Sequence, residues 1–278
     1  MTATVEIGGP FKVEGKPYTI AIAQKPARKS RVWSFWGGKK PIGCWKFDAG
    51  GGATLYDSAG EQDGTIDGAE WATGQSGGAL RFDGTNHVVI PNESVFDFTG
   101  KITVMAWMKA SYLDWRNLSA IIAKGSDGNG GWALQKTGRS NGVSFWVDVA
   151  EMPWDGVKAG VGIFDGQWHH VAGVYDGSNA YIYIDGGLDS NSVSCSGNIK
   201  TNDREVCIGQ DPVSMARPWE GLIDGARVYN YALSKDEVAA IYAGQEPAKR
   251  GNWLPVLIVL VVVVMVVLLA GRKRKTEA

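Results

Sequence analysis

Between residues 42 and 242, short runs of alternating apolar and polar residues recur. The clearest runs cover residues 88–90, 102–108, 143–147, 170–175 and 181–184. A period of two places successive side chains on opposite faces of a β-strand. Asp-Gly, which suits tight hairpin turns, occurs nine times around these runs. With no long amphipathic helical stretch between the strands, the pattern predicts an all-β fold, an antiparallel two-sheet sandwich or jelly roll.

A short helix is expected where this region ends. Ser234 and Glu237 have the spacing of a capping box, in which each side chain bonds the other residue's backbone N–H. Val238, Ile241 and Tyr242 share one helical face, and Gly244 provides the C-terminal stop.

Changes in composition divide the chain into six parts. We expect an incomplete β-rich segment (1–24), a basic linker (25–41), the jelly-roll domain (42–244), a second linker (245–252), a membrane helix (253–271) and a basic tail (272–278).

The membrane helix is predicted from an apolar run without any charge. Its 17 residues from Leu254 to Ala270 would span roughly 26 Å as a helix, close to the ~30 Å of a bilayer core. A core helix or strand of a globular domain is the alternative. Four basic residues at 272–275 outnumber Lys249 and Arg250 on the other side, which predicts a cytoplasmic C-terminus and an extracytoplasmic globular domain.

The first residues do not resemble a secretory leader, because the apolar stretch at 18–23 is short and no basic region precedes it. Three explanations stay open: a true start upstream of Met1, a fragment of a longer chain, or a tail-anchored protein with its domain in the cytoplasm.

Charge is unevenly distributed, although the formal net charge is only −1. Residues 1–40 hold eight basic and two acidic residues, whereas residues 41–270 hold 16 basic and 26 acidic ones. An acidic module is a poor match for a phosphate backbone, so nucleic acid is not an expected partner.

The three cysteines are Cys44, Cys195 and Cys207, and no CxxC motif suggests zinc. Cys195 and Cys207 bracket a turn-rich segment that could join two strands, so we predict a disulfide between them, with two buried free thiols as the alternative.

Several segments together resemble the laminin G-like, concanavalin A-like jelly-roll family. They are 43–48 (GCWKFD), 77–84 (GGALRFDG), 102–109 (ITVMAWMK), 165–172 (DGQWHHVA), 183–186 (YIDG) and 221–234 (GLIDGARVYNYALS). The resemblance implies two packed antiparallel sheets and a surface-recognition role, often toward glycans or matrix proteins. The chain departs from the family at Gly225, where an acidic residue is usual, and at the hairpin tip 85–87.

Catalytic chemistry finds little support in the residue pattern. Glycoside hydrolysis needs two carboxylates across a cleft, and the related glucanases carry them alternating along one strand, a pattern that this chain lacks. Glu151 and Asp155 are separated by Pro153 in a loop-like stretch. His169 and His170 are adjacent in a strand and must point to opposite faces, so they are interpreted as structural.

Calcium is a possible ligand, because this fold often holds one at a sheet edge. Asp83 and Asn86 are the candidate ligands, and Asp127 or Asp211 could complete the site with further oxygens. The alternative is that these side chains only shape turns.

Tryptophans in loops are the candidate ligand contacts, since flat rings cover apolar surface at low entropic cost. Trp115, Trp154 and Trp219 lie in loop-like sequence and would either bind a ligand or pack beneath a loop. Four others in predicted strands are expected in the core: Trp45, Trp107, Trp146 and Trp168.

These observations predict a membrane-anchored, outward-facing, non-catalytic recognition module that binds carbohydrate or a surface or matrix protein. A scaffolding part of a larger envelope protein is the alternative, and a polysaccharide-active enzyme is a more distant one.

Overall fold

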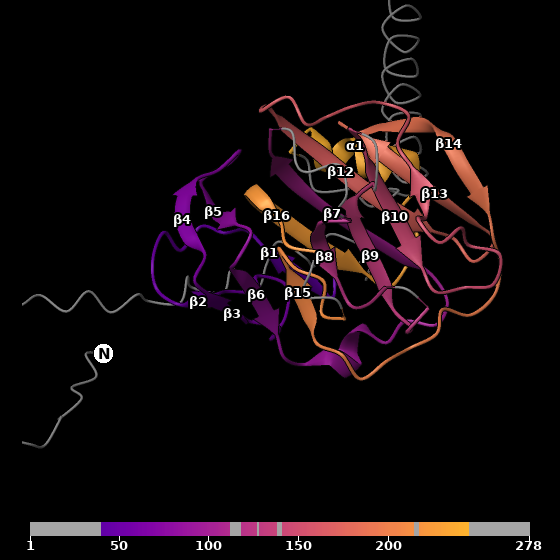
Figure 1. Cartoon of the computed structure of the whole chain (residues 1–278), viewed down its shortest axis with the longest axis horizontal. Coiled ribbons are helices and arrows are strands. Elements are labelled where there is room, and N and C mark those ends of the chain that lie inside the picture. Colours follow the sequence, from indigo (N-terminus) through magenta and orange to yellow (C-terminus); the bar gives the residue numbers. More distant parts are fainter. Residues whose placement is uncertain (1–39, 112–117, 127, 138–140, 214–216, 245–278) are drawn as a thin grey trace, which may run out of the picture.

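The computed structural model describes residues 40–111, 118–126, 128–137, 141–213 and 217–244. Within these ranges two antiparallel sheets face each other as a sandwich, with a short α-helix beside one of them (Figure 1). The predicted all-β sandwich is confirmed.

Sheet A is built around a long strand near the end of the chain. It runs in the order β14 (Gly187–Ser194), β13 (Asn179–Ile184), β12 (Trp168–Tyr175), β7 (Ile102–Lys109), β16 (Glu220–Tyr229), β5 (Gly78–Asp83) and β4 (Glu70–Thr73), and β1 (Gly43–Trp45) also pairs with β16.

Sheet B packs against it. Its order is β11 (Val157–Lys158), β10 (Val143–Val147), β9 (Trp132–Lys136), β8 (Ala120–Ala123), β15 (Val206–Ile208), β6 (His87–Ile90), β3 (Gly64–Asp67) and β2 (Thr54–Leu55). A 3₁₀ helix, η2 (Glu93–Phe96), lies in the connection between β6 and β7.

The main core lies between the sheets and takes alternate residues of each strand, as the period of two requires. In β7, Val104 and Ala106 belong to this core, whereas Met105 belongs to a cluster on the opposite face. The sheets are close-packed at Gly173, where an added Cβ would lie 2.1 Å from the ring of Phe145.

The outer face of sheet A is partly covered by helix α1 (Lys235–Tyr242). The predicted capping box is confirmed: the Glu237 N–H donates to the Ser234 hydroxyl, and the Ser234 N–H donates to the Glu237 carboxylate. Val238 and Ile241 pack with Leu233 on strand residues that include Met105 and Tyr229. This second apolar cluster fixes the helix to the sheet.

The predicted N-terminal segment, most of the basic linker, the linker 245–252, the membrane helix 253–271 and the tail 272–278 lie outside the described residues. None of the helices in the described ranges has the length and apolar character needed to cross a membrane. The anchor therefore stays a prediction from sequence.

The predicted disulfide is wrong. Cys195 and Cys207 are both buried free thiols, as is Cys44. Cys195 follows β14 at an edge of sheet A, whereas Cys207 lies in β15 between Val89 and Ala123 of sheet B. The turn-rich segment thus connects the two sheets instead of closing a hairpin. Burial raises the pKa of Cys195 to about 11 and that of Cys207 to about 12.

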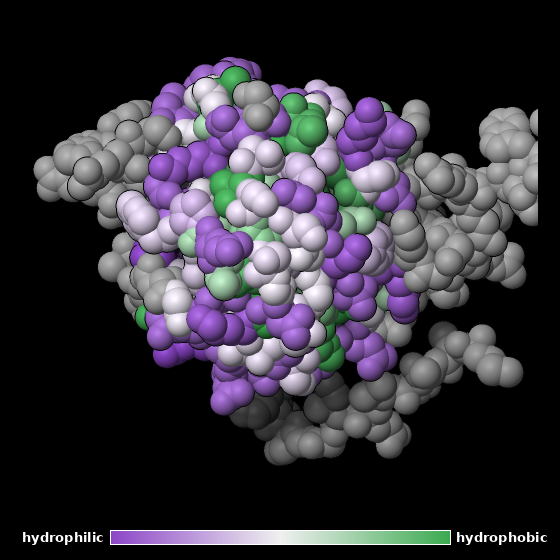
Figure 2. All heavy atoms as spheres, turned by 90° about the vertical axis from the view of Figure 1, so that its right-hand side faces the viewer, coloured by the Kyte–Doolittle hydropathy of each residue, from purple (hydrophilic) through white to green (hydrophobic). Residues whose placement is uncertain are grey.

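Figure 2 shows the molecule from the side of β14. The coloured surface is mainly hydrophilic or of intermediate hydropathy, with hydrophobic residues in small separate spots. The exposed apolar side chains include Leu188 of β14, at 51% exposure. Scattered single residues of this kind are ordinary on a protein surface.

Candidate functional site

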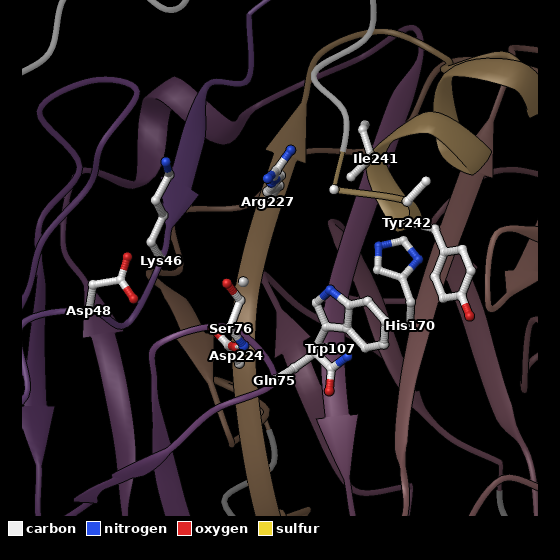
Figure 3. A pocket seen from close by; sticks show the side chains of 13 residues that line it. Lys46, Asp48, Gln75, Ser76, Trp107, His170, Asp224, Arg227, Ile241 and Tyr242 are labelled. Carbon is white, nitrogen blue, oxygen red and sulfur yellow. Dashed lines mark hydrogen bonds between the residues drawn. The ribbon is translucent and has the colours of Figure 1, made fainter.

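A hollow of about 460 Å³ opens on the outer face of sheet A, next to the end of α1 (Figure 3). It is lined by Lys46, Asp48, Gln75, Ser76, Trp107, His170, Asp224, Gly225, Arg227 and residues 241–244. The lining thus combines aromatic, acidic and basic side chains.

Three of these side chains form a row across neighbouring strands. Trp107 of β7 is the register partner of His170 in β12 and of Asp224 in β16. Residues directly opposite each other in a sheet project to the same face. Long-range pairing therefore brings together three residues that are far apart in the chain.

A β-bulge adds Arg227 to the row. The register of β16 against β7 shifts between Asp224 and Arg227, so that more residues of β16 than of β7 fill this interval. Ala226 enters the core, and both charged residues line the hollow. Gly225 takes a φ of +58° within the bulge, a conformation that glycine adopts without steric cost.

The aromatic side of the hollow consists of Trp107, His170 and Tyr242. Trp107 stacks with Tyr242 at 5.4 Å between ring centroids and meets His170 edge-on at 5.3 Å. Tyr242 is 39% exposed and Trp107 is partly exposed, so both rings offer surface to a ligand. His170 is buried, and burial together with the positive charge of Arg227 lowers its pKa to about 3. Its ring is consequently neutral near pH 7.

The buried acid of the site is Asp224, which is 2% exposed. Its Oδ2 accepts a hydrogen bond of 3.1 Å from the N–H of Ser76, in the hairpin between β4 and β5. Burial raises the pKa of Asp224 to about 6, and the negative charge of Asp48 acts in the same direction. A carboxyl group with such a pKa can exchange a proton near neutral pH.

Two exposed charged residues, Lys46 and Asp48, complete the opposite side. Both follow β1, and Figure 3 shows them across the hollow from Trp107, His170 and Tyr242, with Asp224 and Arg227 between. The site therefore offers two carboxylates and two cations beside an aromatic wall.

Trp154 and Trp219, two of the three candidate loop tryptophans, are not among the described residues that line this hollow. Trp154 is 69% exposed in the connection between β10 and β11, and its ligand contact stays a prediction. Trp219 is completely buried and packs against Phe164 at 5.8 Å, so its ring fills the core and is not available to a ligand. Trp115 lies outside the described residues.

The candidate calcium ligands Asp83 and Asn86 are engaged in a turn. Asp83 Oδ1 accepts hydrogen bonds from the N–H and hydroxyl of Thr85, and Asn86 Oδ1 accepts one from the N–H of Asp83. Asp211 is buried and pairs with Arg217 at 3.1 Å, while Asp127 lies outside the described residues. Among the residues that are described, no group of three or more His, Cys, Asp or Glu side chains could hold a metal. Calcium at Asp83 and Asn86 stays a prediction.

The two adjacent histidines have different surroundings, as the alternation of strand side chains requires. His169 Nδ1 lies 2.8 Å from Asp185 Oδ2 and its Nε2 lies 3.2 Å from Asp165 Oδ1. His170 instead belongs to the hollow. The sequence pattern predicts a structural His170 and a core Trp107, and it marks Gly225 only as a departure from the family. The structure instead places all three in the lining of the hollow.

The chain matches the model of the concanavalin A-like lectin/glucanases superfamily over residues 82–239, more than half of its length. The chain belongs to this superfamily. Its concanavalin A-like domain accounts for the two packed sheets that the sequence resemblance implied. No curated protein sequence matched the chain.

Solved structures share the concanavalin A-like fold at low sequence identity. Domain 4 of a GH43 extracellular arabinanase from Geobacillus stearothermophilus, in complex with arabinotriose, is 23% identical with a TM-score of 0.61, covering 73% of this chain and 98% of that domain. The binding domain of paraclostridial mosquitocidal protein 1 is 12% identical with a TM-score of 0.58, and the match covers 73% of this chain and 52% of that one. Trypanosoma rangeli sialidase with the inhibitor DANA is 16% identical with a TM-score of 0.52, covering 73% of this chain and 32% of the sialidase.

These matches correct the function predicted from sequence. The concanavalin A-like fold occurs here as a domain of an arabinanase and as part of a sialidase, so this fold is found in enzymes as well as in binding domains. They give no support to a matrix-protein ligand or to a scaffolding function, and the description of the chain as non-catalytic loses its basis.

Proposed function

We propose that the hollow on the outer face of sheet A binds a carbohydrate. The observation that carries this proposal is the pair of stacked rings, Trp107 and Tyr242, beside the buried carboxylate of Asp224. A sugar ring has an apolar face of C–H groups that packs on aromatic rings, and its hydroxyl groups need fixed acceptors and donors. Asp224 and Asp48 supply acceptors, and Arg227 and Lys46 supply donors.

The comparisons support the same ligand class. One matched structure is an arabinanase domain in complex with arabinotriose, and another is a sialidase. Because their identity to this chain is low, they support the class of ligand, and the residues of the hollow supply the argument for its place.

The balance of charge favours an uncharged sugar over an acidic one. Lys46 and Arg227 offset Asp48 and ionised Asp224, and His170 is neutral. An acidic sugar would bring another carboxylate next to buried Asp224 without adding a cation, and desolvating it there would weaken binding. We therefore expect neutral oligosaccharides such as arabinotriose to bind better than sialylated ones.

Calorimetric titration of the full chain with arabinotriose, other neutral oligosaccharides and sialyllactose tests the proposal. Trp107→Ala should weaken neutral-sugar binding roughly 30-fold, the effect of removing about 2 kcal/mol from a central aromatic contact. Trp154→Ala makes the same change at the exposed loop tryptophan that the sequence marks as a competing ligand contact. If the hollow is the binding site, this variant should leave affinity within about two-fold. The proposal would be overturned if none of the sugars bound, or if Trp154→Ala reduced sugar affinity more than Trp107→Ala.

The same incubations should be analysed for shorter sugars. Two carboxyl groups, one with a raised pKa, are also what general acid–base catalysis uses. Release of shorter sugars that stops in Asp224→Asn would extend the proposal from binding to cleavage, whereas binding without release would limit the hollow to recognition.

A further inference from the structure

Away from the hollow, the ammonium group of Lys124 lies buried in a cage of oxygen atoms. The lysine follows β8 in sheet B and is 1% exposed. Its Nζ lies close to Glu93 Oε2 at 2.8 Å, Asp97 Oδ1 at 3.0 Å, the carbonyl of Asn202 at 2.8 Å and the carbonyl of Arg204 at 3.0 Å.

The composition of the cage is that of a hard-cation site. Two carboxylates and two main-chain carbonyls are oxygen ligands of the kind that calcium takes in proteins. An ammonium has only three N–H groups to donate, so the four close oxygens are more than its hydrogen bonds can account for. The oxygens thus behave as a coordination shell around a single positive charge.

The carboxylate half of the cage is fixed by the core and not by the lysine. Glu93 begins η2 and Asp97 follows its last residue. Phe96, between them, is fully buried and packs against Trp45 and Phe98, each at 6.2 Å. This anchor keeps both acids in place without help from Nζ.

The carbonyl half is fixed by a local turn. Asn202 Oδ1 accepts a hydrogen bond of 2.9 Å from the N–H of Arg204, which closes a turn over the segment that carries both carbonyls. The amide of Asn202 also donates to the main-chain carbonyl of Lys124 at 3.0 Å. Because that bond uses the backbone of residue 124, it survives any change of its side chain.

We propose that this cage is a calcium-type cation site in which the Lys124 ammonium is the bound cation, and that calcium takes its place once the lysine side chain is removed. Glu93 and Asp97 are each 27% exposed, so the cage lies close to the protein surface, with Asp97 Oδ1 turned inward. A divalent ion balances two carboxylates, and the shell must contract from 2.8–3.0 Å to about 2.3–2.6 Å. Magnesium would need about 2.0–2.1 Å and near-ideal octahedral geometry, which this cage is less able to provide.

Thermal unfolding of the full chain and of Lys124→Ala, each in millimolar calcium, magnesium or chelator, tests the assignment. In the parent protein the Lys124 ammonium occupies the cage, so calcium should not raise the melting temperature through this site. The variant in chelator should melt roughly 10 °C lower, because two partly buried carboxylates lose the cation between them. Calcium should restore at least about half of that loss, and magnesium much less.

Two controls separate this site from others. Adding Glu93→Gln to Lys124→Ala should abolish the calcium response, since one ligand charge is gone. Lys200→Ala removes a lysine whose partner is Asp148 but which is itself 67% exposed, and it should create no calcium response.

A folded Lys124→Ala protein that melts alike in calcium and in chelator would overturn the proposal. If the variant folds only when calcium is present, the proposal is supported. If it fails to fold in calcium, magnesium and chelator alike, calcium does not replace the ammonium and the proposal fails.

Discussion

The outer face of sheet A has two halves, and the same three strands build both. In β7, Met105 lies under α1 while Trp107, two residues further on, lines the hollow. In β12 the corresponding pair is Val174 and His170, and in β16 it is Tyr229 and Asp224. Residues separated by an even number share a face in a regular strand. Tyr229 and Asp224 are five residues apart, and the extra residue of the bulge at Gly225 places both on the same face.

The difference between the halves lies in what covers them. The covered half is apolar because α1 excludes water from it, and such burial stabilises the fold. The open half carries a carboxylate, a histidine and partly exposed rings, which contribute little to the core and much to ligand recognition. We therefore expect substitutions in the covered half to change stability, and substitutions in the open half to change binding and pH dependence.

The largest effect should come from the covered half. Leu233→Ala removes a side chain that is 3% exposed in the cluster beneath α1, and it should lower the free energy of unfolding by about 3 kcal/mol through lost burial and a residual cavity. Leu188→Ala makes the same change at a residue that is 51% exposed, and its effect should stay within about 0.5 kcal/mol. If chemical denaturation gave the same loss of unfolding free energy for both variants, α1 would not be excluding water from the cluster.

A smaller effect, on the pH dependence of stability, is expected at Asp224. Its pKa is raised from 3.8 to about 6, so between these values the folded state binds more protons than the unfolded state. The contribution to stability is therefore present below pH 4 and is lost as pH rises through 6, by an amount on the order of 2 kcal/mol.

Asp224→Asn should remove this dependence. Denaturation of both proteins at pH 4 and pH 7 should show the parent losing stability relative to the variant on going to pH 7. His170, with its pKa lowered to about 3, acts in the opposite direction over acidic pH, but it is present in both proteins and cancels in the comparison. A pH-independent difference would contradict the raised pKa.

The smallest effect should separate backbone strain from contact with the ligand site. Gly225→Ala and Gly50→Ala both place a Cβ on a residue with positive φ, at +58° and +67°, and each should cost about 1 kcal/mol. An added Cβ at Gly225 would lie 3.2 Å from Trp107 Cδ1, whereas Gly50 has open space. Sugar affinity should therefore fall in Gly225→Ala alone, and a similar fall in Gly50→Ala would break the link between the bulge and Trp107.

Much of the architecture could be predicted because it depends on local pattern. The alternating run at 102–108 became β7, the run at 143–147 became β10, and the capping box at Ser234 began α1. Period and capping are properties of neighbouring residues, so a single sequence contains them.

The candidate site could not be predicted in the same way, because it depends on which strands pair. Nothing within 102–108 distinguishes Trp107 from a core residue, and only its register with His170 and Asp224 brings the three together. Cys195 and Cys207 show the same limit: a turn-rich segment between two cysteines is equally compatible with a hairpin and with a crossing between sheets. The Asp-Gly pair at 224–225 was the one local signal of the site, since glycine in mid-strand often marks a bulge.

Ile241 belongs both to the cluster beneath α1 and to the wall of the hollow, and the last turn of the helix continues that wall to Gly244. A sugar bound in the hollow would contact the C-terminal turn of α1, and the end turns of a helix are the parts that fray most readily. Occupancy of the hollow and docking of α1 are consequently linked, so that each favours the other. Slower amide hydrogen exchange at residues 241–244 in the presence of sugar would be the direct sign of that coupling.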